Sequence, residues 1–133
     1  MRWIMLMALS IALAACTQQP PPGPEPQPTR VFTVYFDAGS AAITPTGQEI
    51  IGNVAEALRR DRPSKIIVEG QAFAGFPGDA ELAVKRADTV VDALVKAGVD
   101  SSALVRRTAL VGPASSDSVT RVSTQKVLVE FLP

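Results

Sequence analysis

The chain has 133 residues, and 47% of them are hydrophobic, which is enough for one domain with an apolar core. Lys and Arg together number 13, as do Asp and Glu, and this balance argues against a nucleic-acid partner, which calls for a basic excess. There is no His and only one Cys, so an intramolecular disulfide is excluded and the usual general base and zinc ligand are missing. Because no phosphate loop or metal-ligand spacing occurs either, we predict no enzymatic activity, no metal and no cofactor.

The first fifteen residues have the pattern of a secretion signal. Met1 and Arg2 give a positive start, and residues 3–15 are apolar except for Ser10. These thirteen residues, at about 1.5 Å each, make a helix of roughly 20 Å, which is too short for a hydrocarbon core of about 30 Å. We therefore predict that residues 1–15 are a signal peptide and not a transmembrane anchor.

The signal ends in Leu13-Ala14-Ala15-Cys16, an apolar residue and two small residues before a cysteine. This resembles the lipobox of bacterial lipoproteins, which implies lipidation of Cys16 and attachment to a membrane through the lipid. An ordinary signal peptide with a chance Cys is the alternative. The next residue is Thr17 and not Asp, which by resemblance to the common sorting rule favours the outer membrane, with the domain facing the periplasm.

Residues 17–29 read TQQPPPGPEPQPT, with six prolines and no large apolar residue. Such a segment cannot pack a core, and polyproline II is its natural conformation. At about 3.1 Å per residue it would extend roughly 40 Å. We expect residues 16–29 to be the lipidated Cys followed by a stiff tether. The alternative is a disordered linker, which would differ from this tether only in stiffness.

Residues 30–36 are β-branched and aromatic, and they predict a strand that is buried on much of both faces. Thr44-Pro45 then has the pattern of an N-cap followed by proline at the first helical position. An apolar stripe at helical spacing follows, and Pro63 breaks the helix. Three arginines gather at the helix end, where they suit the helix dipole as a solvated end or, alternatively, form an anion site: Arg59, Arg60 and Arg62.

The second half of the chain predicts one helix and three strands. A short apolar strand covers residues 65–70, and a loop with two Phe residues covers 71–78. Asp79 is expected to cap a helix that ends before Gly98. The last two strands are predicted at 105–111 and 126–132, joined by residues 112–123.

The order β-α-β-α-β-β predicts an α/β fold of the α+β sandwich type, in which two long helices lie on a mixed four-stranded sheet. The two strand-helix-strand crossovers imply parallel pairing, and the last strand is expected to be antiparallel. We assign residues 30–133 to this single domain. A domain of about 100 residues buries around two-thirds of its unfolded surface, which suffices for independent folding.

Several short motifs occur in a fixed order along this domain. Together they resemble the OmpA-like, peptidoglycan-associated domain family over residues 32–131, and the lipobox and Pro-rich tether fit that resemblance. The motifs are Phe36-Asp37 followed by Ile43-Thr44-Pro45, then Val68-Glu69-Gly70, Asp79-x-x-Leu82-Ala83-x-x-Arg86-Ala87 and Val129-Glu130-Phe131.

The resemblance implies binding of diaminopimelate in the peptidoglycan stem peptide. In the family, an Asp in a Gly-His-Thr-Asp loop and an Arg on the second helix hold the charged groups of the ligand. Arg86 falls on that Arg, but Gly70 is followed by Gln71, Ala72 and Phe73, so the loop Asp is missing. The ligand residues expected from this resemblance are Arg86, Phe73, Gln71, Asp79 and Asp37.

Three of these residues have a second interpretation. Arg86 could be a surface arginine of the helix, paired with an acidic neighbour. Phe73 and Phe76 could form a recognition patch or cover the core, and Asp37 could bind a ligand or stabilise a turn.

Two function classes remain open. The first is a lipoprotein that tethers the outer membrane to peptidoglycan through weakened, non-covalent binding. The second is a protein-interaction or structural module of an envelope assembly that has lost peptidoglycan binding. For the first class we expect weak binding that Arg86→Ala removes, and that Phe73→Asp strengthens if the loop after residue 70 keeps the course it has in the family.

Overall fold

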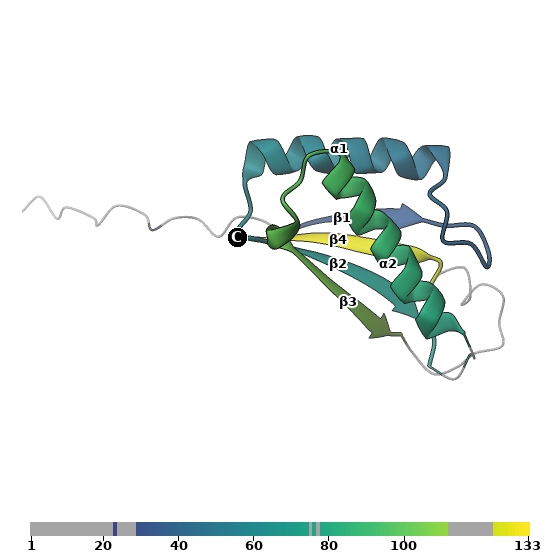
Figure 1. Cartoon of the computed structure of the whole chain (residues 1–133). Coiled ribbons are helices and arrows are strands. Elements are labelled where there is room, and N and C mark those ends of the chain that lie inside the picture. Colours follow the sequence, from purple (N-terminus) through teal and green to yellow (C-terminus); the bar gives the residue numbers. More distant parts are fainter. Residues whose placement is uncertain (1–22, 24–28, 75, 77, 112–123) are drawn as a thin grey trace, which may run out of the picture.

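The computed structural model describes residue 23 and residues 29–74, 76, 78–111 and 124–133. The predicted signal peptide 1–15, the lipidation site Cys16, most of the tether and the connection 112–123 lie outside the described residues. The elements, drawn in Figure 1, are β1 (Arg30–Tyr35), α1 (Pro45–Asp61), β2 (Lys65–Ala72), α2 (Asp79–Lys96), the 3-10 turn η1 (Ser101–Ala103), β3 (Leu104–Leu110) and β4 (Lys126–Leu132).

The four strands form one mixed sheet in the order β1-β4-β2-β3. β4 is antiparallel to both of its neighbours, and β2 and β3 are parallel. The predicted fold class and the antiparallel last strand are therefore confirmed. Parallel pairing of β1 with β2 is wrong, because β4 lies between them and hydrogen-bonds to both.

Both helices cover the same face of the sheet. Val34 of β1 and Gly70 of β2 are both paired with Val127 of β4, so the three positions share one face. An ideal Cβ on Gly47 of α1 would lie 3.3 Å from Val34, and one on Gly70 would meet the backbone of Ala83 in α2. Figure 1 shows α2 crossing the sheet and α1 running beside β1.

The core lies between this face and the two helices. Its strand residues alternate with partly exposed ones, as β4 shows with Val127, Val129 and Phe131 buried. The helices contribute the predicted apolar stripes, including Ile51, Val54, Ala87, Val90 and Leu94.

The helix starts differ from each other in their capping. Thr44 caps α1 as predicted, because its hydroxyl accepts a hydrogen bond from the Gly47 N–H at 3.0 Å. In α2 the cap position belongs to Gly78, with φ of 83° and no side-chain bond, and Asp79 is the first helical residue. The prediction that Asp79 caps α2 is therefore wrong, and its carboxylate is not used by the helix backbone.

Strand β2 is longer than predicted. It continues to Ala72, because Gln71 and Ala72 still pair with Ala109 and Leu110 of β3. Gln71 is thus a strand residue and not a loop residue. In the part of the chain that the structure describes, no helix has the length and apolarity to cross a membrane.

Candidate functional site

Arg86, in the middle of α2, is buried, with 3% of its surface exposed. Its Nε donates a hydrogen bond to the Ser40 carbonyl at 2.7 Å, and its Nη2 donates one to the Asp37 carbonyl at 3.0 Å. Its guanidinium carbon lies 5.4 Å from the centre of the Phe36 ring. The alternative of a surface arginine in an ion pair is therefore wrong, because main-chain carbonyls and an aromatic ring hold this side chain.

The turn after β1 supplies those carbonyls. The Ser40 N–H donates to the Asp37 carbonyl at 3.1 Å, and Gly39 takes a φ of 67° at the third position of this turn. Asp37 therefore acts through its backbone in a turn, as one of its two interpretations predicted. The turn fixes where the guanidinium of Arg86 lies.

The charge of Arg86 persists despite its burial. Burial lowers the pKa of the guanidinium, and the negative charge of Asp79 raises that pKa. The group stays protonated at neutral pH because the ordinary pKa of arginine is so far above neutrality. A guanidinium has about five N–H donors, and two of them hold the turn. Within the described residues the other donors have no hydrogen-bond partner, so they can serve a ligand.

A pocket of about 280 Å³ opens next to this guanidinium, and we call it the Arg86 pocket. It lies where the turn after β1, the end of β2, the start of α2 and the start of β4 meet. Three of the five predicted ligand residues, Arg86, Gln71 and Asp79, line it, and the others are Ala38, Gly39, Phe76, Leu82, Thr124 and Gln125.

Asp79 provides the negative charge of the Arg86 pocket. Among the described residues its carboxylate makes no hydrogen bond and no direct ion pair, yet its charge acts on Arg86. The pocket thus carries one cation and one anion that do not neutralise each other by contact.

Phe73 does not line this pocket. Its ring is 3% exposed, and its centre lies 6.2 Å from that of Phe76 in an edge-on arrangement. This burial favours the interpretation of Phe73 as cover for the core. Phe76 is the aromatic residue on the pocket wall. In Phe73→Asp the new carboxylate would be buried, which argues against the expected strengthening of binding.

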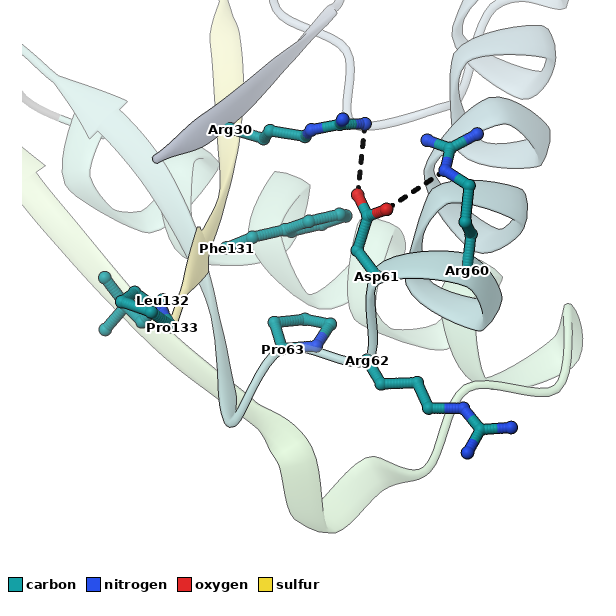
Figure 2. Close-up of a pocket in the computed structure, with 8 residues that line it drawn as sticks. All are labelled: Arg30, Arg60, Asp61, Arg62, Pro63, Phe131, Leu132 and Pro133. Carbon is teal, nitrogen blue, oxygen red and sulfur yellow. Dashed lines mark hydrogen bonds and ion pairs between the residues drawn. The ribbon is translucent and has the colours of Figure 1, made fainter. Parts of the chain in front are cut away.

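A second pocket, of about 460 Å³, lies at the opposite end of the sheet, between the end of α1 and the ends of β1 and β4 (Figure 2). The Asp61 carboxylate binds Arg30 and Arg60, each at 3.0 Å, while Arg62 points away from this group. Arg59 is exposed and pairs with Glu56 at 3.5 Å. These pairs favour the solvated helix end over an anion site.

Among the described residues, no group of three or more acidic, His or Cys side chains could hold a metal ion. Residues 35–127 match the profile of the OmpA family. The chain belongs to the OmpA family.

One relative in the family is a probable lipoprotein, YiaD of Escherichia coli K12. The two sequences are 33% identical over 103 residues, which cover 74% of this chain and 46% of that protein. The chain therefore matches less than half of the length of this relative.

Solved structures of the OmpA type have the same fold. The OmpA-like domain of FopA1 from Francisella tularensis aligns with a TM-score of 0.66 and 20% identity, over 79% of this chain and 73% of that chain. The peptidoglycan-associated lipoprotein of Burkholderia pseudomallei aligns with a TM-score of 0.62 and 22% identity, over 74% of this chain and 88% of that chain. The cell wall anchor of the T6SS from Pseudomonas aeruginosa aligns with a TM-score of 0.64 and 20% identity, over 78% of this chain and 81% of that chain.

Sequence reasoning missed Thr124 as a residue of the Arg86 pocket and left the register of Gln125 beside it undetermined. Gln125 and the buried Thr124 enter it from the start of β4, and the Gln125 carbonyl accepts a hydrogen bond from the Phe36 N–H at 2.8 Å. Only the place of β4 between β1 and β2 brings these residues beside Gln71. The signal in the sequence is their position directly before the last strand, which does not reveal the neighbours of that strand.

Proposed function

We propose that this OmpA-family chain is a lipoprotein of the outer membrane whose domain binds the peptidoglycan stem peptide non-covalently through the Arg86 pocket. The observation that carries the proposal is a buried, charged Arg86 that lines a pocket and keeps N–H donors that no described residue occupies. The name of the Burkholderia structure, a peptidoglycan-associated lipoprotein, supports the same ligand.

The chemistry of the pocket suits the diaminopimelate end of a stem peptide. A guanidinium binds a carboxylate with two parallel hydrogen bonds, and such charged bonds are stronger than neutral ones. Because Ser40 and Asp37 already hold the guanidinium, little side-chain freedom is lost when a ligand binds. The amides of Gln71 and Gln125 add neutral donors and acceptors to the wall.

The position of the pocket also suits a tethered domain. Arg30, which follows the predicted tether, pairs with Phe131 near the end of β4, whereas the pocket contains residues 124 and 125 at the start of β4. Because β1 and β4 are antiparallel, the start of β1 and the start of β4 lie at opposite ends of the sheet (Figure 1). The pocket is therefore far from the point where the predicted tether is attached. A domain anchored through Cys16 would present the pocket away from the membrane and toward the cell wall.

A protein-interaction module is the second candidate, and the sheet face without helices favours it. Val31 and Tyr35 of β1 lie on that face with 53% and 56% of their surface exposed. Two ion pairs of Arg107, with Glu69 and Glu130, interrupt the apolar surface between the outer strands. This separation makes the face a weaker candidate than the pocket.

A pull-down with purified peptidoglycan sacculi tests the proposal. The wild-type chain should sediment with sacculi, and Arg86→Ala should lose most of this binding because it removes the carboxylate-binding group. Arg59→Ala, which removes an exposed arginine of α1, is the matched control and should bind normally. Since Arg86 also holds the turn after β1, the folding of Arg86→Ala is checked by thermal unfolding.

Wild-type protein that stays in the supernatant would contradict peptidoglycan binding. The protein-interaction module would then be the remaining candidate function. Binding that a folded Arg86→Ala variant retains in full would show that another site is in use.

A further inference from the structure

We propose that Asp79 determines the specificity of the Arg86 pocket by accepting the ammonium group of a ligand whose carboxylate is bound by Arg86. The pocket would thereby select a zwitterionic end group, such as the free amino-acid end of diaminopimelate. The inference rests on the proposed peptidoglycan-binding function, and it assigns to a helix residue the acidic role that the loop after β2 lacks.

The first support is the composition of the pocket wall. Of the residues that line the Arg86 pocket, Asp79 is the acidic one and Arg86 the basic one. The remaining polar side chains are neutral, namely Gln71, Thr124 and Gln125. A ligand group with one positive and one negative charge therefore finds one complementary partner for each charge.

The second support is that Asp79 is not used elsewhere. It is the first residue of α2, and the cap position before it is a glycine without a side-chain bond. Within the described residues its carboxylate has no hydrogen-bond partner and no direct ion pair. The start of a helix favours a negative charge, so this position stabilises an ionised carboxylate that can bind a cationic group of a ligand.

The third support is the spacing of the two charges. Asp79 and Arg86 are seven residues apart on α2, which places them on the same face, two turns or about 10.5 Å along the axis. Their side chains do not meet in an ion pair, but burial lowers the pKa of Arg86 while the charge of Asp79 raises it. A space therefore remains between two opposite charges that act on each other.

The fourth support is that the loop after β2 offers no carboxylate. Gln71 is neutral, Ala72 and Phe73 are buried, and Phe76 brings an aromatic ring to the wall. Among the described residues of the pocket wall, Asp79 is therefore the carboxylate that can receive an ammonium group.

The test compares two ligands and two variants by calorimetry with the purified full-length chain. The first ligand is the stem tripeptide that ends in diaminopimelate. The second is the same peptide with the free amine of its diaminopimelate residue acetylated. Asp79→Asn should weaken binding of the free-amine peptide about tenfold, as expected for the loss of one charge-assisted hydrogen bond. The acetylated peptide should bind the wild type and Asp79→Asn equally, and Asp79→Glu should restore part of the preference.

Asp92→Asn is the matched control, because Asp92 is an exposed acid on the same helix, outside the pocket. It should bind both peptides like the wild type. Equal binding of the free-amine peptide by the wild type and Asp79→Asn would overturn the role of Asp79. If Arg86→Ala still weakens binding in that case, the proposed function stands, whereas failure of the wild type to bind either peptide or sacculi contradicts the function itself.

Discussion

Buried side chains at the end of β2 determine what the neighbouring pocket can contain. Phe73 is buried against Phe76, at the position in the sequence where the family resemblance expects a ligand-binding acid. Arg86 is equally buried, but it is satisfied by two carbonyls and a ring. A charge is therefore tolerated at residue 86 and not at residue 73, because only the first has partners.

The Phe73→Asp variant tests this difference. We expect it to lower the free energy of unfolding by about 3 kcal/mol or more, since the ring is lost and a carboxylate is buried without a cation. Phe73→Leu, which stays apolar, should cost about 1 kcal/mol. Urea unfolding of both variants measures the effect, and a stable Phe73→Asp with tighter binding to sacculi would instead favour the original expectation of a ligand position.

At the scale of elements, the contact between α2 and β2 sets the depth of Arg86. A Cβ placed on Gly70 would lie 2.2 Å from the Ala83 carbonyl oxygen, and Ala83 itself is completely buried. Only glycine allows this approach, so the backbone of the helix lies directly on the strand. Arg86 follows Ala83 by one helical turn and is thereby brought down to the turn after β1.

Gly70→Ala should consequently push the helix from the sheet. We expect a loss of about 3 kcal/mol in the free energy of unfolding, the upper part of the range for overpacking, because the obstructing atom belongs to the backbone. Gly52→Ala is the control in α1, where an added Cβ has nothing within 4 Å, and it should stabilise by about 0.5–1 kcal/mol. Equal unfolding midpoints for Gly70→Ala and the wild type would show that the helix moves without cost.

For the whole molecule, the sheet order places the Arg86 pocket and the pocket beside Arg30 at opposite ends of the sheet. The larger pocket lies beside Arg30, at the end from which the predicted tether leaves, and its acid is already paired with two arginines. The smaller Arg86 pocket lies at the far end with unused donors. Under the proposed function, the end of the sheet beside Arg30 would be an attachment end and the end with the Arg86 pocket a binding end.

The attachment end predicts a result for Cys16. Cys16→Ser should abolish incorporation of radiolabelled fatty acid and release the chain from the membrane fraction, because two or more acyl chains are needed for stable anchoring. Ser10→Ala, a substitution inside the apolar stretch, is the control and should change neither result. Membrane attachment of both variants without any lipid label would contradict the lipid anchor.

Local patterns in the sequence were sufficient for the elements of the domain. Apolar periodicity located both helices and all four strands, and Thr44-Pro45 marked the start of α1, because side-chain alternation and capping depend on neighbouring residues. The family resemblance also pointed to Arg86, which lines a pocket in a domain that belongs to the OmpA family. These features are encoded within stretches of a few residues.

Tertiary structure alone decided the order of the strands and the composition of the pocket. Insertion of β4 between β1 and β2 is a long-range pairing that no local pattern contains, and it delivers Gln125 to the site. Whether Phe73 or Asp79 faces the pocket depends on how α2 lies on β2, which the close contact at Gly70 controls. The sequence thus determined which residues carry charge, and packing determined which of those charges share one pocket.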